Sequence, residues 1–295
     1  MVIRTMDRPT TWEQAPVEYV TSKDGTRLGY RQFGHGAGLV LVQGTMGTAL
    51  HFKELAEALA PHYTVCIPDR RGRGMSEGST DGYTAQKDVE DLDVLLRETG
   101  AQFVFGLSAG ALITLQAALT LPTLHKFAIF EPPLFVDNLP TQLIARFESE
   151  MAQGKLESAM VSAMLAARMG PAIFGYIPRW LLERFVKMGM AQEAKKGAGK
   201  YPTMRELSGT LRYDLEIVRE MSGPAQRFQA IENDVLLLGG SQSPAYLKAA
   251  LDALDKVLPH ATRIELEGVG HSAPWNADQR GKPELVAQAL HGFFG

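Results

Sequence analysis

Short apolar segments of strand length alternate with helical patterns along most of this chain. The apolar segments are 38–44, 63–69, 102–106, 126–133, 234–240 and 262–268. Nearly continuous apolar strands are typical of a parallel sheet that is buried on both faces. Helical patterns between them, at 51–60, 85–100, 109–119, 244–258 and 283–294, supply the crossover connections. The sequence therefore predicts an α/β fold with a doubly wound, mostly parallel sheet. Before it, residues 17–34 predict a β-hairpin through Asp24-Gly25.

One interval interrupts this alternation. Residues 134–223, here called the helical segment, contain helical patterns and no strand signal. We therefore predict a core formed by residues 1–133 and 224–295, with the helical segment inserted as a cap. The segment holds 8 of the 12 methionines, among them Met151, Met160, Met164, Met169, Met188 and Met190. Methionine is flexible and polarizable, so these residues either form an adaptable pocket roof or simply pack the segment against the sheet.

Composition limits the classes of partner. The 295 residues carry 30 basic and 33 acidic side chains, and the formal net charge of -3 predicts attraction to neither nucleic acid nor an anionic membrane. The basic turn Arg70–Gly74 is too short to change that prediction. We expect a cytoplasmic protein, because no apolar run could span a bilayer and the first residues lack a signal sequence. A lone cysteine, Cys66, excludes an internal disulfide, and the histidine spacing predicts no metal site.

The sharpest local pattern is Gly-x-Ser-x-Gly at Gly106–Gly110, centred on Ser108. It lies between a predicted strand and a predicted helix. A serine at such a turn is lifted above the edge of the sheet, where its hydroxyl can attack a substrate. Flanking glycines relieve crowding where the strand and the helix converge. The pattern predicts a nucleophilic serine.

With this pattern, the chain resembles the α/β-hydrolase superfamily over nearly its full length. The resemblance rests on "VQGTMG" after the third predicted strand, "DRRGRGMS" after the fourth, the Ser108 turn after the fifth, and "GVGHS" near the end. The superfamily usually carries its cap after the sixth strand, where the helical segment begins. The resemblance implies no cofactor, and a catalytic order of serine, acid and histidine along the chain.

His271 follows the last predicted strand, so it is the candidate general base that activates Ser108. The oxyanion needs two N–H donors, and we assign them to the backbone of Ala109 and Thr45. The superfamily commonly has His-Gly before the second donor, whereas this chain has Gln43-Gly44. The loop that contains Thr45 is called the donor loop here. Because of that departure, the sequence leaves open which hydrogen bonds support this loop.

The catalytic acid is not where the superfamily usually has it. The stretch after the seventh predicted strand, "GGSQSP", contains Ser241 and Ser243 but no carboxylate. Some branches of the superfamily place the acid after the sixth strand instead. There Glu131 stands at the carboxyl end of the strand signal, where ligand sites of such sheets gather. We predict Glu131 as the acid, with Asp137 as the second candidate.

These assignments predict a cofactor-independent serine hydrolase that acts on an ester or lactone of an apolar small molecule. Hydrolysis of a carbon–carbon bond is a variant of the same chemistry. The alternative is a ligand-binding, receptor or cyclase-type protein with the same fold and no hydrolytic step, because fold does not determine function. Polar residues near Asp214 either enter the pocket or form a structural network. The oligomeric state does not follow from the sequence.

Overall fold

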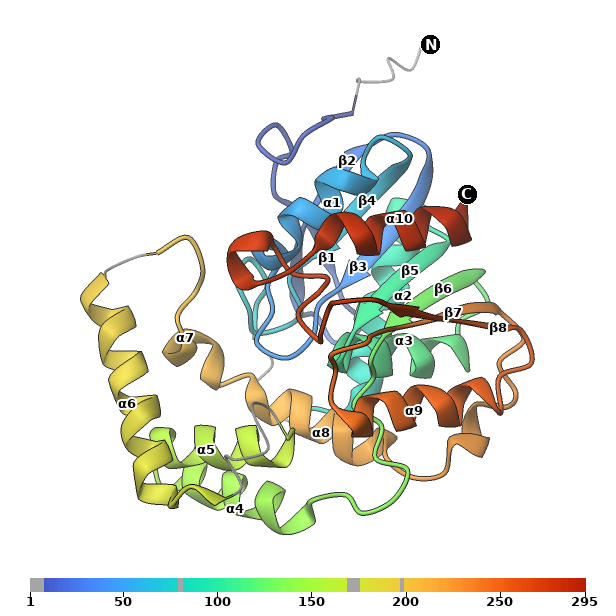
Figure 1. The fold of residues 1–295 in the computed structure, drawn as a ribbon. Coiled ribbons are helices and arrows are strands. Elements are labelled where there is room, and N and C mark those ends of the chain that lie inside the picture. The colour runs from blue at the N-terminus through green and yellow to red at the C-terminus, as the bar shows by residue number, and fades with distance from the viewer. Residues whose placement is uncertain (1–7, 79–81, 169–175, 197–198) are drawn as a thin grey trace.

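The computed structural model describes residues 8–78, 82–168, 176–196 and 199–295. Its centre is an eight-stranded sheet with the strand order β1-β2-β4-β3-β5-β6-β7-β8 (Figure 1). The strands are β1 (Glu18–Thr21), β2 (Arg27–Gly34), β3 (Ala37–Val42), β4 (Tyr63–Pro68), β5 (Phe103–Leu107), β6 (Lys126–Phe130), β7 (Asp234–Gly240) and β8 (Ala261–Leu266). β3 to β8 pair in parallel, and β1 and β2 form the predicted antiparallel hairpin. The predicted fold class is confirmed.

Helices cover both faces of the sheet. One layer contains α1 (Lys53–Leu59) and α10 (Pro283–Phe294), and the other contains α2 (Ala85–Thr99), α3 (Ala109–Ala118) and α9 (Ala245–Asp255) (Figure 1). Side chains alternate along each strand. On β3, Leu39 and Leu41 pack in the α1 layer, whereas Val40 and Val42 pack in the α2 layer. This double burial explains why the strands read as unbroken apolar runs.

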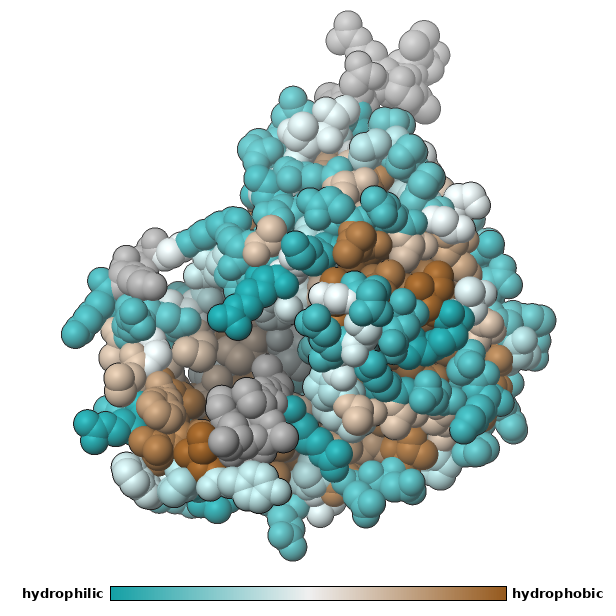
Figure 2. All heavy atoms as spheres, in the orientation of Figure 1, coloured by the Kyte–Doolittle hydropathy of each residue, from teal (hydrophilic) through white to brown (hydrophobic). Residues whose placement is uncertain are grey.

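The described part of the helical segment contains five α-helices and no strand. They are α4 (Thr141–Ala152), α5 (Leu156–Ala166), α6 (Arg179–Lys196), α7 (Met204–Ser208) and α8 (Leu211–Met221). α4, α5 and α8 share a small apolar cluster that includes Ile144, Phe147 and Leu211. Trp180 and Met188 of α6 are exposed. In Figure 2 the surface is hollowed between this segment, at the lower left, and the core.

The methionines of the segment do not gather in one place. Met151 and Met160 pack against the small apolar cluster, and Met221 belongs to the core beneath the sheet. Met190 is buried and Met188 is exposed. Met164 is partly buried, and Met169 lies outside the described residues. Met221 thus packs the segment against the sheet, as the second interpretation expected, whereas Met151 and Met160 pack helices of the segment against one another.

The single cysteine lies in the centre of the sheet. Cys66 is on β4 and is fully buried, and this burial raises the pKa of its thiol well above the usual range. The reactive species in alkylation and disulfide exchange is the thiolate. Both properties make Cys66 unreactive in the folded state.

We therefore expect a thiol reagent to leave native Cys66 unmodified and to label it stoichiometrically in denaturant. The measurement is the absorbance released by a chromogenic disulfide in buffer and in guanidinium chloride. An exposed cysteine introduced as Lys187→Cys is the control, because position 187 lies on the outer surface of α6. Rapid labelling of Cys66 in the native protein would contradict the buried placement.

Candidate active site

Ser108 lies at the turn from β5 into α3, with φ 55° and ψ -118°. Such a positive φ is strained for a residue with a side chain. The two flanking glycines are required by close contacts. A Cβ atom on Gly106 would lie 2.5 Å from the Gly110 carbonyl oxygen, and one on Gly110 would lie 2.4 Å from the Val42 carbonyl oxygen. Strand and helix converge here as the sequence pattern predicted.

Glu131 and His271 are in direct contact. The Oε2 atom of Glu131 lies 2.7 Å from Nδ1 of His271, and its Oε1 accepts the Gly240 N–H at 2.7 Å. The glutamate is fully buried, whereas the histidine side chain is 35% exposed. A carboxylate at Nδ1 holds the imidazole in the tautomer whose Nε2 is free to accept a proton. Glu131 also has a positive φ of 48°, which turns the chain sharply at the end of β6.

The end of β7 makes room for this glutamate. A Cβ atom on Gly239 would lie 3.2 Å from Glu131 Oε1. Ser241 donates to Glu267, and the Ser243 hydroxyl is buried with no partner among the described residues. The second candidate acid, Asp137, is exposed. The last residue of β7, just before the loop that lacks an aspartate, thus contributes its N–H to the Glu131 carboxylate.

The loop after β3 approaches Ser108. A Cβ atom on Gly44 would lie 2.9 Å from the Ser108 Cβ atom. Within the described residues, the N–H groups of Thr45 and Ala109 donate no hydrogen bond to a protein acceptor. Ala109 begins α3, so its N–H has no partner within the helix. Free backbone donors beside a buried hydroxyl are what an oxyanion hole requires.

Gln43 supports this loop in place of the histidine common in the superfamily. Its side chain is fully buried, and Nε2 donates to the Pro68 carbonyl at 2.9 Å and to the Leu41 carbonyl at 3.3 Å. These bonds join the ends of β3 and β4. Oε1 has no partner among the described residues. The departure at Gln43 therefore leaves the loop tied to the sheet through one end of the amide.

The stretch "DRRGRGMS" holds the other end of the loop. The buried Asp69 accepts the Ala49 N–H at 2.6 Å and the Met75 N–H at 2.8 Å, and burial raises the pKa of its carboxyl. Arg70 and Arg71 are also buried and form ion pairs with aspartates, at 2.7 Å and 2.6 Å respectively. Both guanidinium groups are therefore paired inside the protein.

Ser108 and His271 themselves are not joined by a hydrogen bond within the described residues. Contacts of this kind are often long before substrate binds, so geometry without substrate does not exclude a candidate base. Among the described residues, no group of three or more His, Cys, Asp or Glu side chains could hold a metal ion. In the same residues, no helix is long and apolar enough to cross a membrane.

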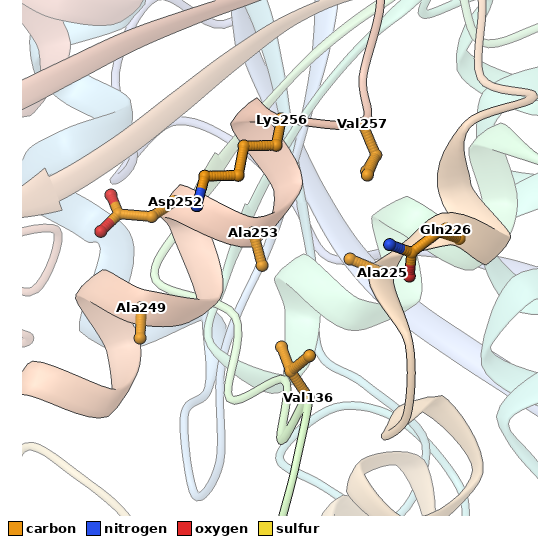
Figure 3. Close-up of a pocket in the computed structure, with 8 residues that line it drawn as sticks. All are labelled: Val136, Ala225, Gln226, Ala249, Asp252, Ala253, Lys256 and Val257. Carbon is orange, nitrogen blue, oxygen red and sulfur yellow. The ribbon is translucent and has the colours of Figure 1, made fainter.

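A separate hollow of about 300 Å³ lies between α9 and the 3₁₀ helix η3 (Ala225–Phe228). Figure 3 shows Asp252 on α9 and Lys256 just after its end at one side of the hollow and Gln226 at the other, with Val136 between them. Its lining contains none of the candidate site residues.

His51 is a site neighbour that the sequence did not indicate. It lies in the 3₁₀ helix η1 (Ala49–Phe52), directly after the donor loop. Its ring packs against Tyr201 of the helical segment in a tilted arrangement and against Trp275 of the His271 loop edge-on. Desolvation lowers the pKa of His51 to about 4. Its Nδ1 accepts the Thr48 N–H at 3.1 Å, which suits a neutral imidazole. The only sequence signal for a role of His51 near the site is its position four residues after "GTMG".

We expect the buried, neutral His51 to make stability depend on pH. The pKa of this histidine is about 6.5 in the unfolded chain and about 4 in the folded protein. Between these two pH values only the unfolded state binds the proton. Stability is therefore present above pH 6.5 and is lost as the pH falls toward 4. Between pH 7.5 and 5 the expected loss from this group is about 2 kcal/mol.

Urea unfolding at the two pH values tests this. The drop in unfolding free energy should be smaller in His51→Gln than in the wild type, because glutamine does not titrate. His35→Gln is the matched control, since His35 is exposed and should leave the drop unchanged. An equal drop in all three proteins would show that His51 does not carry the effect.

Comparison with known proteins agrees with this architecture. A model of the "Alpha/beta hydrolase family" matches residues 33–289. A "Pimeloyl-[acyl-carrier protein] methyl ester esterase" of Xanthomonas campestris is 27% identical over 273 residues, covering 88% of this chain and 96% of the relative. The crystal structure of an alpha/beta hydrolase from Sphaerobacter thermophilus is 32% identical, with a TM-score of 0.75 and coverage of 94% of this chain and 100% of the other.

A thermophilic esterase from Thermogutta terrifontis shares the fold at 18% identity, with a TM-score of 0.68 and coverage of 94% of this chain and 97% of that structure. The family match spans most of the chain and includes both Ser108 and His271. The chain belongs to the alpha/beta hydrolase family.

Proposed function

We propose that this protein is a serine hydrolase that cleaves an ester or lactone of an apolar small molecule through an acyl-enzyme. The observation that carries the proposal is the 2.7 Å contact between the buried Glu131 carboxylate and His271 Nδ1. A structural histidine does not need a fully buried carboxylate at one nitrogen while the other side of the ring stays accessible. That arrangement is the one a general base needs.

The proposed reaction gives each of these groups one role. His271 Nε2 accepts the Ser108 proton as the hydroxyl oxygen attacks the carbonyl carbon. The Thr45 and Ala109 N–H groups stabilise the oxyanion, and Glu131 stabilises the imidazolium. His271 then returns the proton to the departing alcohol, which leaves an acyl group on Ser108. A water molecule, deprotonated by His271, releases the acid and restores the serine.

The substrate class rests on the surroundings of the donor loop. Met46, which follows Thr45, packs against the apolar cluster of α4, α5 and α8. The helical segment is therefore proposed to act as a cap that presents apolar surface to the acyl or alcohol group. The Xanthomonas relative is an esterase of a methyl ester, which supports ester cleavage here. Lactone and carbon–carbon bond hydrolysis would use the same groups.

We expect Ser108→Ala to lower the hydrolysis of p-nitrophenyl esters by at least about 10³-fold, because the change removes the attacking oxygen and little else. The wild type should also be labelled stoichiometrically by a fluorophosphonate, and the variant should not. Ser208→Ala is the matched control, since it removes another buried hydroxyl, on α7. An inert Ser108 in a protein that binds apolar ligands tightly would favour a receptor or cyclase-type role.

The identity of the acid has its own test. Glu131→Gln should retain the shape of the side chain but lose the charge that fixes the tautomer, lowering kcat on the order of 10³-fold. Asp137→Asn should stay within about twofold of the wild type, because Asp137 is exposed. Both variants are measured on one ester at one pH. A crippled Asp137→Asn beside an active Glu131→Gln would show that the acid is assigned to the wrong residue.

A further inference from the structure

Arg73 joins the donor loop to the helical segment. Its side chain is almost fully buried, and Nη1 donates to the Gly44 carbonyl at 2.8 Å and to the Gly47 carbonyl at 3.3 Å. On its other side, Nη2 donates to Asp214 at 2.6 Å and Nε to Thr210 at 3.1 Å. One guanidinium thus bonds two loop carbonyls and two acceptors at the start of α8.

The bond to Gly44 has a direct consequence for Thr45. The Gly44 carbonyl and the Thr45 N–H belong to the same peptide group, which is planar and trans. In a trans peptide these two groups point in opposite directions. When Arg73 holds the carbonyl on one side of the loop, the Thr45 N–H must therefore face the other side. The approach of Gly44 to Ser108 places this loop beside the nucleophile.

Without Arg73 this peptide group would have little to hold it. Gly44 has no Cβ atom, so rotation of the peptide meets little steric resistance. Apart from Arg73, the Gly44 carbonyl accepts only the Gly47 N–H, at 3.1 Å, among the described residues. A rotation of the peptide group by half a turn would replace the Thr45 N–H by a carbonyl oxygen. A carbonyl there would repel the oxyanion that the N–H should stabilise.

We propose that Arg73 is a positioning residue that sets the direction of the Thr45 donor, and that Asp214 on α8 holds Arg73 in place. The inference rests on the proposed function, since the direction of this N–H matters only if Ser108 forms an oxyanion. A cation at the carbonyl also polarises the peptide group, which makes its N–H a stronger donor. The packing of α8 on the core therefore affects the direction of the Thr45 N–H, because Asp214 on α8 holds Arg73.

Two other arginines of the same stretch provide comparisons. Arg71 is as buried as Arg73, but its guanidinium bonds to Asp91 at 2.6 Å and to Asp24 at 2.9 Å and not to the donor loop. Arg70 shares Asp214 with Arg73, at 2.7 Å, and also pairs with Asp88 at 3.0 Å. The same kind of substitution can therefore be made with and without a connection to the loop.

The first experiment compares Arg73→Lys with Arg71→Lys. Lysine keeps the charge but cannot reach acceptors on two sides at once. We expect Arg73→Lys to lower kcat on the order of 10- to 100-fold while KM changes by less than about threefold. Its affinity for an alkyl boronic acid, whose adduct with serine is tetrahedral, should fall with kcat. Both variants should lower the melting temperature by similar amounts, because each disturbs a buried ion pair, but Arg71→Lys should leave kcat within about twofold.

A second pair covers the case in which Arg73→Lys does not fold. Asp214→Asn and Asp88→Asn each remove one buried carboxylate from Arg70, but only Asp214 also holds Arg73. We expect kcat and boronate affinity to fall in Asp214→Asn and to stay near the wild type in Asp88→Asn. Equal kinetic effects within each pair, or a change in KM alone, would overturn the role of Arg73. Full activity of Ser108→Ala would instead overturn the proposed function.

Discussion

The site depends on a ladder of hydrogen bonds across the carboxyl ends of β5, β6 and β7. The Ser108 N–H donates to the Phe130 carbonyl at 2.9 Å, and the Glu131 N–H donates to the Leu238 carbonyl at 3.1 Å. The Gly240 N–H then bonds the Glu131 side chain. Ser108 and Glu131 are thus held by adjacent rungs of one ladder. Their separation is set by the spacing of strands and not by flexible side chains.

The same edge explains why the carboxylate at His271 can follow β6 instead of β7. β6 and β7 are neighbours, with Phe130 paired to Leu238, so a carboxylate that follows either strand can reach the same histidine. Glu131 needs the longer side chain and a positive φ, which costs of the order of 1 kcal/mol. Gly239 and Gly240 offset this cost by leaving space for the carboxylate and donating to it. The missing carboxylate after β7 and the glutamate after β6 are therefore parts of one structural change.

Two of the three buried arginines, Arg70 and Arg73, tie the helical segment to the core through Asp214. Charges removed from water are costly unless each is paired, and Arg70, Arg71 and Arg73 are all matched by carboxylates. Burial lowers the pKa of Arg73, and the Asp214 carboxylate opposes that shift. Asp214 therefore belongs to a structural network, the second of the two interpretations that its sequence context allowed. The same network reaches the loop of Thr45, so stability and site geometry share residues.

The sequence by itself determined the sheet, its helices and the turn at Ser108. These features depend on local patterns: apolar runs, helical periodicity and glycines on either side of a serine. It also placed Glu131 and His271 at strand ends, and the hydrogen bond between them could be predicted because parallel strands end at one edge. Their catalytic roles, and those of Thr45 and Ala109, stay predictions.

Only the tertiary structure decided the contacts between distant segments. The burial of His51 against Tyr201 and Trp275 joins three parts of the chain that no local pattern relates. The same is true of Arg73, which reads as one more basic residue in a short turn until α8 brings Asp214 to it. Whether a polar side chain is exposed or buried against a partner depends on how the helical segment packs. That packing is a property of the whole chain, and it is what turns a basic turn into the support of the donor loop.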